Sequence, residues 1–206
     1  MTIKRFWVGL LLMLILGGVI LIVAAGLFAP DVSTVKEQAC LTAAERDGCI
    51  RFPLVSGLSL SGTEVTLPDD FDGDYTLVIV PFDDDQQVLA GTWLEPVQVL
   101  TEQHPGLMYY NTAVLPDLAP AVRVVVRMGM NALITDAHLR DVTITLFLSD
   151  RDALLTALDI PDVDAIQVFL LNRDGEVLWR NSGDYTPDKG NSLAAFLSRL
   201  VAEASW

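Results

Sequence analysis

The longest hydrophobic run of the chain lies near its start and extends from Phe6 to Ala29 without a charged side chain. At about 1.5 Å per helical residue the run is about 36 Å long, more than the ~30 Å hydrocarbon core of a bilayer. It is therefore predicted to cross a membrane as one helix. Lys4 and Arg5 precede it, whereas Asp31 and Glu37 follow it. The positive-inside rule then places the rest of the chain outside the cytoplasm, as a single-pass membrane protein.

A cleavable signal peptide is the alternative for this segment. Lys4 and Arg5 are also typical of a signal peptide's positive start, and Ala24-Ala25 provides small residues for cleavage. Its apolar core would have about 7 to 15 residues, shorter than the run found here, which favours an uncleaved anchor. We therefore divide the chain into an N-terminal tip and anchor (1–30), a juxtamembrane neck (31–61) and one globular domain (62–206).

The pattern of the globular domain alternates between strands and helices. Polar–apolar alternation, or short apolar runs between turn residues, predicts strands at 62–68, 75–82, 107–112, 141–148, 165–171 and 176–181. Apolar residues spaced three and four apart predict helices at 86–103, 119–134, 150–158 and from 191 or 192 to 203. This order indicates an α/β sandwich with a mixed central sheet flanked by helices and, across Asp174-Gly175, an antiparallel hairpin.

Two of these helices carry apolar residues that we expect to face the sheet. In the helix at 86–103 they are Val88, Leu89, Trp93, Val97 and Leu100. In the helix at 119–134 they are Val122, Val125, Val126, Met130 and Leu133. The arginines of this region, Arg123, Arg127 and Arg140, are expected on a solvated, ion-paired face.

The charge balance excludes one class of partner. Asp and Glu number 27 against 13 Lys and Arg, giving a formal net charge of −14. All the acids follow the apolar run, so the exported part should repel nucleic acid and anionic lipid headgroups. We expect no nucleic-acid partner.

The two cysteines of the chain, Cys40 and Cys49, both lie in the neck, with Asp47-Gly48 as a turn between them. In an oxidising compartment this arrangement favours a structural disulfide that closes a small loop. Two free thiols are the alternative. The spacing fits neither a C-x-x-C redox pair nor a zinc knuckle.

Few other residues carry candidate chemistry. Asp83, Asp84 and Asp85 follow a buried strand, at the sheet edge where α/β proteins usually bind ligands. A solvated acidic loop is the favoured interpretation, and a cation site the alternative. A phosphatase of the haloacid-dehalogenase type is disfavoured, because Gln87 stands where that family has Thr or Val. We identify no catalytic residue, no metal ligand and no cofactor.

The strand ending in Pro81-Phe82 and the terminal block from Val168 to Leu200 resemble the thioredoxin fold over about Gly62 to Leu200. Within that superfamily, Gln87, Trp93 and Pro96, with the FLLNRDGEVLWRNSG block, are similar to the thioredoxin-fold assembly factors of mitochondrial ATP synthase. The resemblance implies a thioredoxin-like domain.

The chain departs from this family where the chemistry would be. A catalytic thioredoxin carries W-C-x-x-C at the start of the helix after its central strand, because the helix start lowers a thiol pKa. The corresponding residues here are Trp93-Leu-Glu-Pro-Val97, none of which contains sulfur. The family's cis-proline before the next central strand is replaced by Asp164-Ala165.

The resemblance therefore implies a fold retained for binding, and the assembly factors suggest a chaperone-like role toward a protein in or at the membrane. Its expected binding surface consists of Asp83, Asp84, Asp85, Trp93, Glu95 and Pro96. A divergent redoxin-type enzyme with an unidentified reactive group is the alternative from another functional class.

Overall fold

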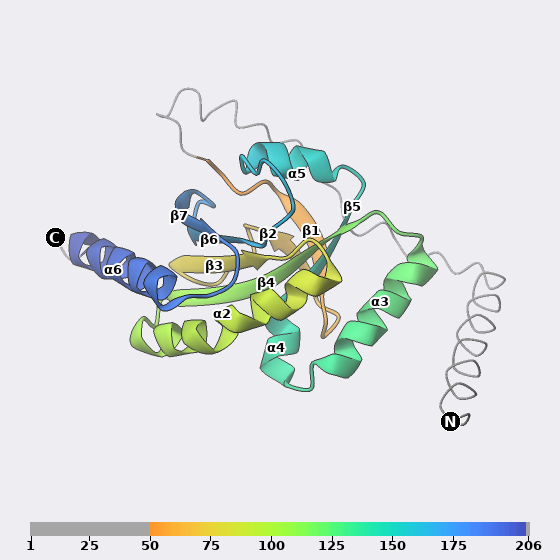
Figure 1. Cartoon of the computed structure of the whole chain (residues 1–206), viewed down its shortest axis with the longest axis horizontal. Helices are drawn as coiled ribbons and strands as arrows, with labels where there is room; N and C mark the ends of the chain where they lie inside the picture. Colours follow the sequence, from red (N-terminus) through yellow and green to blue (C-terminus); the bar gives the residue numbers. More distant parts are fainter. Residues whose placement is uncertain (1–49, 205–206) are drawn as a thin grey trace, which may run out of the picture.

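A computed structural model describes residues 50–204, which form a single seven-stranded sheet with helices on both faces (Figure 1). The strands are β1 (Val55–Ser59), β2 (Glu64–Leu67), β3 (Tyr75–Val80), β4 (Leu107–Pro116), β5 (Thr143–Leu148), β6 (Gln167–Asn172) and β7 (Val177–Ser182). The helices are α2 (Asp84–Gln103), α3 (Pro120–Leu133), α4 (Ala137–Val142), α5 (Arg151–Ala157) and α6 (Pro187–Ala204).

The sheet is mixed, with the strand order β2-β1-β5-β4-β3-β6-β7. β3, β4 and β5 run parallel to one another, whereas β1 and β6 are antiparallel to the parallel strands beside them. Hairpins β1–β2 and β6–β7 thus close the two sides of a parallel centre. The predicted mixed sheet flanked by helices is confirmed.

Strand position in the sheet follows from composition. Leu77, Val78, Ile79 and Val80 are completely buried, as expected for a continuous apolar run in a strand covered on both faces. The edge strand β7 is only half-buried, and the other edge strand, β2, is short. Within β1, Gly57 lies so close to β5 that an added Cβ would come within 2.5 Å of Leu146 Cδ2.

The helices are distributed unequally between the two faces of the sheet. α2, α3 and α4 lie on one face, α5 lies on the opposite face, and α6 packs next to the edge strand β7 (Figure 1). The carboxyl end of β3 leads directly into α2, so the first turn of α2 stands at the edge of the sheet. This first turn is where the sequence places the candidate acidic residues.

Several elements differ from their predicted bounds. α2 begins at Asp84, not Gln86, and α6 begins at Pro187, four residues before the predicted cap. The short helix α4 is not predicted by the sequence pattern, which assigns its residues to a loop and the following strand. β1 is not predicted either; it lies inside the segment 31–61 that the sequence assigns to the neck, and it pairs with both β2 and β5.

The packing faces of two helices are also corrected. In α2, Trp93 and Val97 are buried as predicted, but Val88 is 74% exposed and Leu89 is exposed as well. In α3, no side chain is fully buried, and Val122, Val125 and Leu133 face solvent.

The predicted membrane span Phe6–Ala29 and both cysteines, Cys40 and Cys49, lie outside the described residues. Within residues 50–204, no helix is both long enough and apolar enough to cross a bilayer.

Candidate functional site

The resemblance set Trp93 to Val97 at the position of the family's thiols, at a helix start, but in the structure these residues lie in the middle of α2. The start of α2 is instead built from acids and amides. Asp83 is the N-cap residue, and its Oδ1 accepts a hydrogen bond from Gln86 N at 2.9 Å. Asp84 and Asp85 occupy the first turn, where negative charge interacts favourably with the helix dipole. The sequence predicts a solvated loop for Asp83 to Asp85; they are exposed, but they begin the helix.

Gln86 fixes this helix start to the rest of the domain. Its side chain is buried; its Oε1 accepts from Phe82 N at 2.9 Å, and its Nε2 donates to Val163 O at 2.6 Å. One amide therefore connects the end of β3, the first turn of α2 and the segment before β6.

A second amide pair lies beside it. Asn111 of β4 is buried and donates through Nδ2 to Gln87 Oε1 at 3.4 Å, while its Oδ1 has no partner among the described residues. The inner side of the site is thus neutral and polar. Amides are neither nucleophiles nor general bases near neutral pH, so these side chains hold the helix in place rather than supply chemistry.

The carboxylates form the outer side of the site. No described Lys or Arg pairs with Asp83, Asp84 or Asp85. No group of three or more His, Cys, Asp or Glu in residues 50–204 is arranged to hold a metal ion. The three acids therefore stand as a negatively charged, solvated edge.

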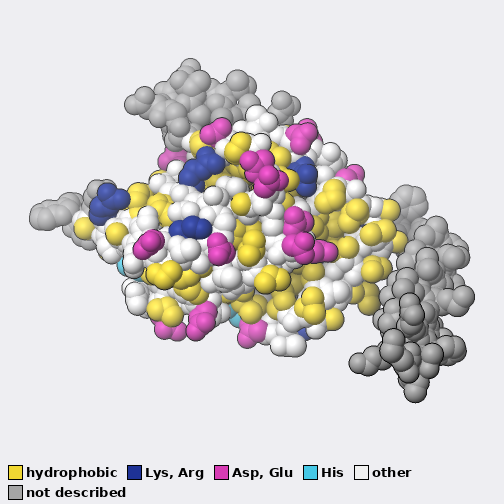
Figure 2. All heavy atoms as spheres, in the orientation of Figure 1, with side chains coloured by type: hydrophobic (Ala, Val, Ile, Leu, Met, Phe, Trp, Pro, Cys, Tyr) yellow, Lys and Arg dark blue, Asp and Glu magenta, His cyan; other side chains and the backbone are white. Residues whose placement is uncertain are grey.

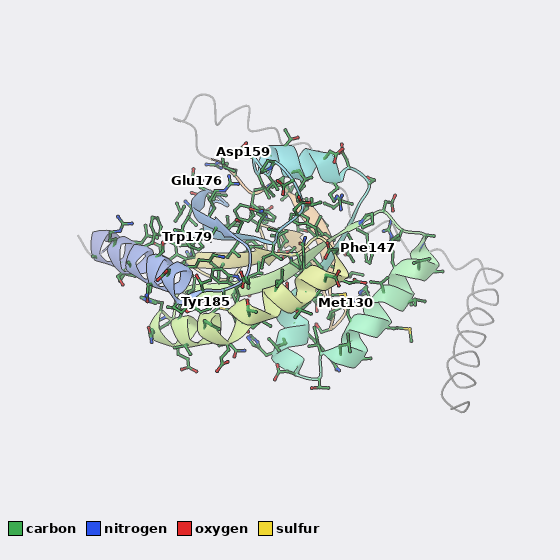
Figure 3. All side chains as sticks on the ribbon, in the orientation of Figure 1. Met130, Phe147, Asp159, Glu176, Trp179 and Tyr185 are labelled. Atoms are coloured by element: carbon green, nitrogen blue, oxygen red, sulfur yellow. The ribbon has the colours of Figure 1, made fainter. Side chains whose placement is uncertain are left out.

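Trp93 does not belong to an exposed surface, contrary to its predicted place there. It lies about two and a half turns into α2 and is completely buried. Its Nε1 donates to Gly183 O at 3.0 Å, and its ring makes edge contacts with Trp179 and Tyr185 at centroid distances of 6.4 and 5.3 Å. Figure 3 shows Trp179 and Tyr185 at the side of the sheet where α6 lies. Trp93 thus joins α2 to the β7–α6 end of the fold.

The two remaining predicted surface residues, Glu95 and Pro96, differ in exposure. Glu95 is exposed and Pro96 is half-buried. Asp84, Val88, Gly91 and Glu95 are exposed at helical spacing, so they form one outward stripe, and no atom lies within 4 Å of where a Gly91 Cβ would be. We call these four residues the α2 stripe. It combines two carboxylates with one exposed apolar side chain, and sequence periodicity missed it by assigning Val88 to the core.

The described residue nearest to the cysteines lies at the other end of the sheet. Ile50 directly follows Cys49, and its carbonyl accepts from Val177 N at 2.8 Å. Arg51 pairs with Glu176 beside the β6–β7 turn. In β6, Leu171 pairs with Val177, whereas Gln167 pairs with Val80 just before α2. These two ends of β6 are about 13 Å apart at about 3.3 Å per residue.

The segment before β6 also differs from a dithiol site. β6 begins at Gln167, so Ile166 is the residue that directly precedes it; Ile166 is completely buried. Pro161 lies earlier, in the loop after α5. Within the described part of the chain, neither a thiol at the helix start nor a proline directly before β6 is present.

Comparisons with known proteins identify the architecture. No protein-family model matches the chain, and no curated protein matches it significantly. Among solved structures, it is similar to a thiol:disulfide interchange protein from Bacteroides sp., with 20% identity, a TM-score of 0.50, and 73% of this chain and 90% of that chain covered.

It is also similar to BsSco, a member of the Sco family of cytochrome c oxidase assembly proteins. Here the identity is 11% and the TM-score 0.51, over 73% of this chain and 93% of that chain. At these identities the likeness concerns the fold alone. The described part of this chain therefore has a thioredoxin-like fold.

Proposed function

We propose that this chain is a non-catalytic binding module, of assembly or chaperone type, held by Phe6–Ala29 at the extracytoplasmic side of a membrane. The observation that carries the proposal is the start of α2, where Asp83, Asp84, Asp85 and Gln86 occupy the place of a dithiol. Thiol exchange requires a thiolate at an electropositive helix start, and these residues supply no sulfur.

The attachment of the chain at Ile50 and Arg51 restrains one of the two cysteines, Cys49. A thiol of Cys49 at the start of α2 would require Ile50 to leave its hydrogen bond with Val177 and Arg51 to leave its ion pair with Glu176. Consecutive Cα atoms are only about 3.8 Å apart, so Cys49 cannot bridge about 13 Å while Ile50 stays in place; this limit does not apply to Cys40, which precedes Ile50 by ten residues.

The α2 stripe supplies the binding surface of the proposal. Its carboxylates and the acidic edge beside it favour a partner with a basic surface, and Val88 offers an apolar contact at its centre. BsSco, one of the two solved structures above, belongs to a family of cytochrome c oxidase assembly proteins, which accords with an assembly role for a membrane complex.

A charge reversal tests the binding surface. The full chain with Asp84→Lys should capture less partner from native membranes than the unchanged chain, because the substituted side chain repels a basic surface. Asp174→Lys is the matched control, since Asp174 is an exposed acid of the β6–β7 turn at the opposite end of the sheet. Quantitative mass spectrometry after affinity capture measures the difference. Equal loss with both variants, or with neither, would contradict the assignment of the partner to the α2 stripe.

A divergent redoxin-type enzyme is the second candidate function. The similar Bacteroides structure is a thiol:disulfide interchange protein, and BsSco contains a disulfide switch. An insulin-reduction assay with the full chain separates the two functions. The binding module should show no turnover above a Cys40→Ser, Cys49→Ser variant, whereas turnover that this variant loses while folded would establish the enzyme.

A further inference from the structure

The outward half of α3 lacks polar side chains, which is the reverse of an ordinary surface helix. Val122, Val124, Val125, Met128 and Leu133 are between 42% and 85% exposed, and we call these five residues the α3 outer face. The exposed positions between them are Gly129 and Ala132. In Figure 2, hydrophobic side chains gather at the right, over α3.

The polar side chains of α3 point toward the domain instead. Arg127 Nη2 donates to Ser59 O at 2.6 Å, and Asn131 Nδ2 donates to Leu60 O at 2.9 Å. Arg123 pairs with Asp117, and its guanidinium lies 5.4 Å from the centre of the Phe147 ring. Burial lowers the pKa of Arg127. The inward half of the helix thus carries its charge and the outward half carries none.

Polar groups of the sheet below α3 explain why the polar side chains of the helix face inward. Thr145 and Ser59 are buried polar residues at the β1–β5 boundary, and the carbonyls at the end of β1 accept from the helix. Only Val126 and Met130 of α3 pack on the small apolar cluster of Ala113, Leu115 and Phe147 (Figure 3). Because the polar contacts fix the rotation of the helix, its apolar residues are left facing outward.

An exposed apolar face of this kind marks an interaction surface. We propose that the α3 outer face docks on the membrane that the chain is anchored in, inserting its side chains at the boundary between headgroups and acyl chains. The inference rests on the proposed anchor. Residues 30–49 join that anchor to Ile50, and an extended chain of this length spans at most about 70 Å, which keeps the domain near the bilayer.

Charge favours the bilayer over a second copy of the chain. The net charge is −14, so two copies would repel each other on contact. Pro120–Leu133 contains no Asp or Glu, and its only charges are two arginines. Both arginines point toward the domain, so the outward half of the helix is apolar and uncharged, which fits the interface of an uncharged bilayer.

Depth measurement on the full chain in phosphatidylcholine vesicles tests the docking. A spin label is placed at Met128→Cys in a Cys40→Ser, Cys49→Ser background. Its collision rates are measured with oxygen, which concentrates in hydrocarbon, and with a water-soluble nickel chelate. The control label is at Val99→Cys, since Val99 is an exposed apolar residue in the second half of α2, and that half of the helix points away from α3 (Figure 1). We expect a several-fold higher oxygen-to-nickel ratio at position 128 than at position 99.

Equal ratios at the two positions in a vesicle-bound chain would overturn the docking while leaving the proposed binding function untouched. Spin–spin broadening at position 128 would overturn it in favour of a second copy. Failure of the chain to remain with the vesicles after carbonate extraction would overturn the anchor together with the docking.

A charge variant provides the second test. With the label moved to Leu133→Cys, Met128→Asp should shift the label toward water, because a carboxylate resists entry into the acyl region. Val99→Asp is its matched control and should leave the depth of that label unchanged. Since both replaced side chains are exposed, circular dichroism should report the same fold for both variants. An unchanged depth with Met128→Asp would overturn the docking.

Discussion

Among the residues at the start of α2, Gln86 has the clearest structural role. Its side chain meets one backbone donor and one backbone acceptor, and the acceptor lies 77 residues away in sequence. Asp83 caps the helix at the same point. Leaving a buried polar group unpaired costs about 1–3 kcal/mol, so substitutions that break these contacts should destabilise the domain. Asp83 and Gln86 thus hold the helix start through contacts within the chain itself.

Trp93 is the residue whose substitution should lower the free energy of unfolding most. Trp93→Ala should lower the free energy of unfolding by about 3–5 kcal/mol, because it removes a completely buried ring and leaves a cavity between α2 and β7. Trp179→Ala is the control: Trp179 is only half-buried in the same aromatic cluster. Urea unfolding of the full chain in detergent measures both. A loss for Trp93→Ala no larger than that for Trp179→Ala would contradict its role as an internal anchor.

At the scale of elements, the sequence predicted whether a segment is a helix or a strand better than it predicted which side of a helix faces the sheet. β3 was predictable because its apolar run is uninterrupted. The rotation of α3 was not, because apolar residues lie on nearly every side of that helix. Its orientation depends on Arg127 and Asn131 bonding to carbonyls 68 and 71 residues away in sequence. Local periodicity carries no information on such pairs.

The candidate site was partly predictable at the same scale. The sequence identified Asp83 to Asp85 and began the helix at Gln86, two residues late, but it aligned the family's dithiol segment with Trp93 to Val97, in the middle of the helix. Asp83 with Gln86 three residues later resembles a capping box, and this signal would have located the helix start correctly. The inward turn of Trp93 depends on Gly183, which lies 90 residues further along the chain.

The weak attachment of α3 has a dynamic consequence. Backbone amides of α3 should exchange with deuterium faster than those in the middle of α2, because α3 has no fully buried side chain whereas α2 has five buried residues. Hydrogen-exchange mass spectrometry on the detergent-solubilised chain compares peptides from 120–133 and 90–100. Comparable or slower exchange in α3 would show that its polar contacts hold it as firmly as a buried face would.

At the scale of the whole molecule, one end of the sheet receives the chain from the neck and the other carries the proposed binding surface. The hairpin end receives the chain from the neck at Ile50 and Arg51, through a backbone hydrogen bond and an ion pair. The other end presents the start of α2, whose carboxylates face solvent. Attachment and the proposed binding surface are therefore separated by the length of the central strands.

The orientation of the whole chain gives the last prediction. If Lys4 and Arg5 remain in the cytoplasm, a reporter active only outside the cytoplasm should work when fused after Trp206. A cytoplasm-dependent reporter at the same position should be inactive. In Figure 1 the end of α6, at Ala204, points away from the sheet, so the fusion should not disturb the core. Exchanging Lys4 and Arg5 for acids should weaken the bias toward export, because the flanking positive charges orient the span. The opposite reporter activities in the unchanged chain would place the acidic domain in the cytoplasm, and a partner would then have to be sought there.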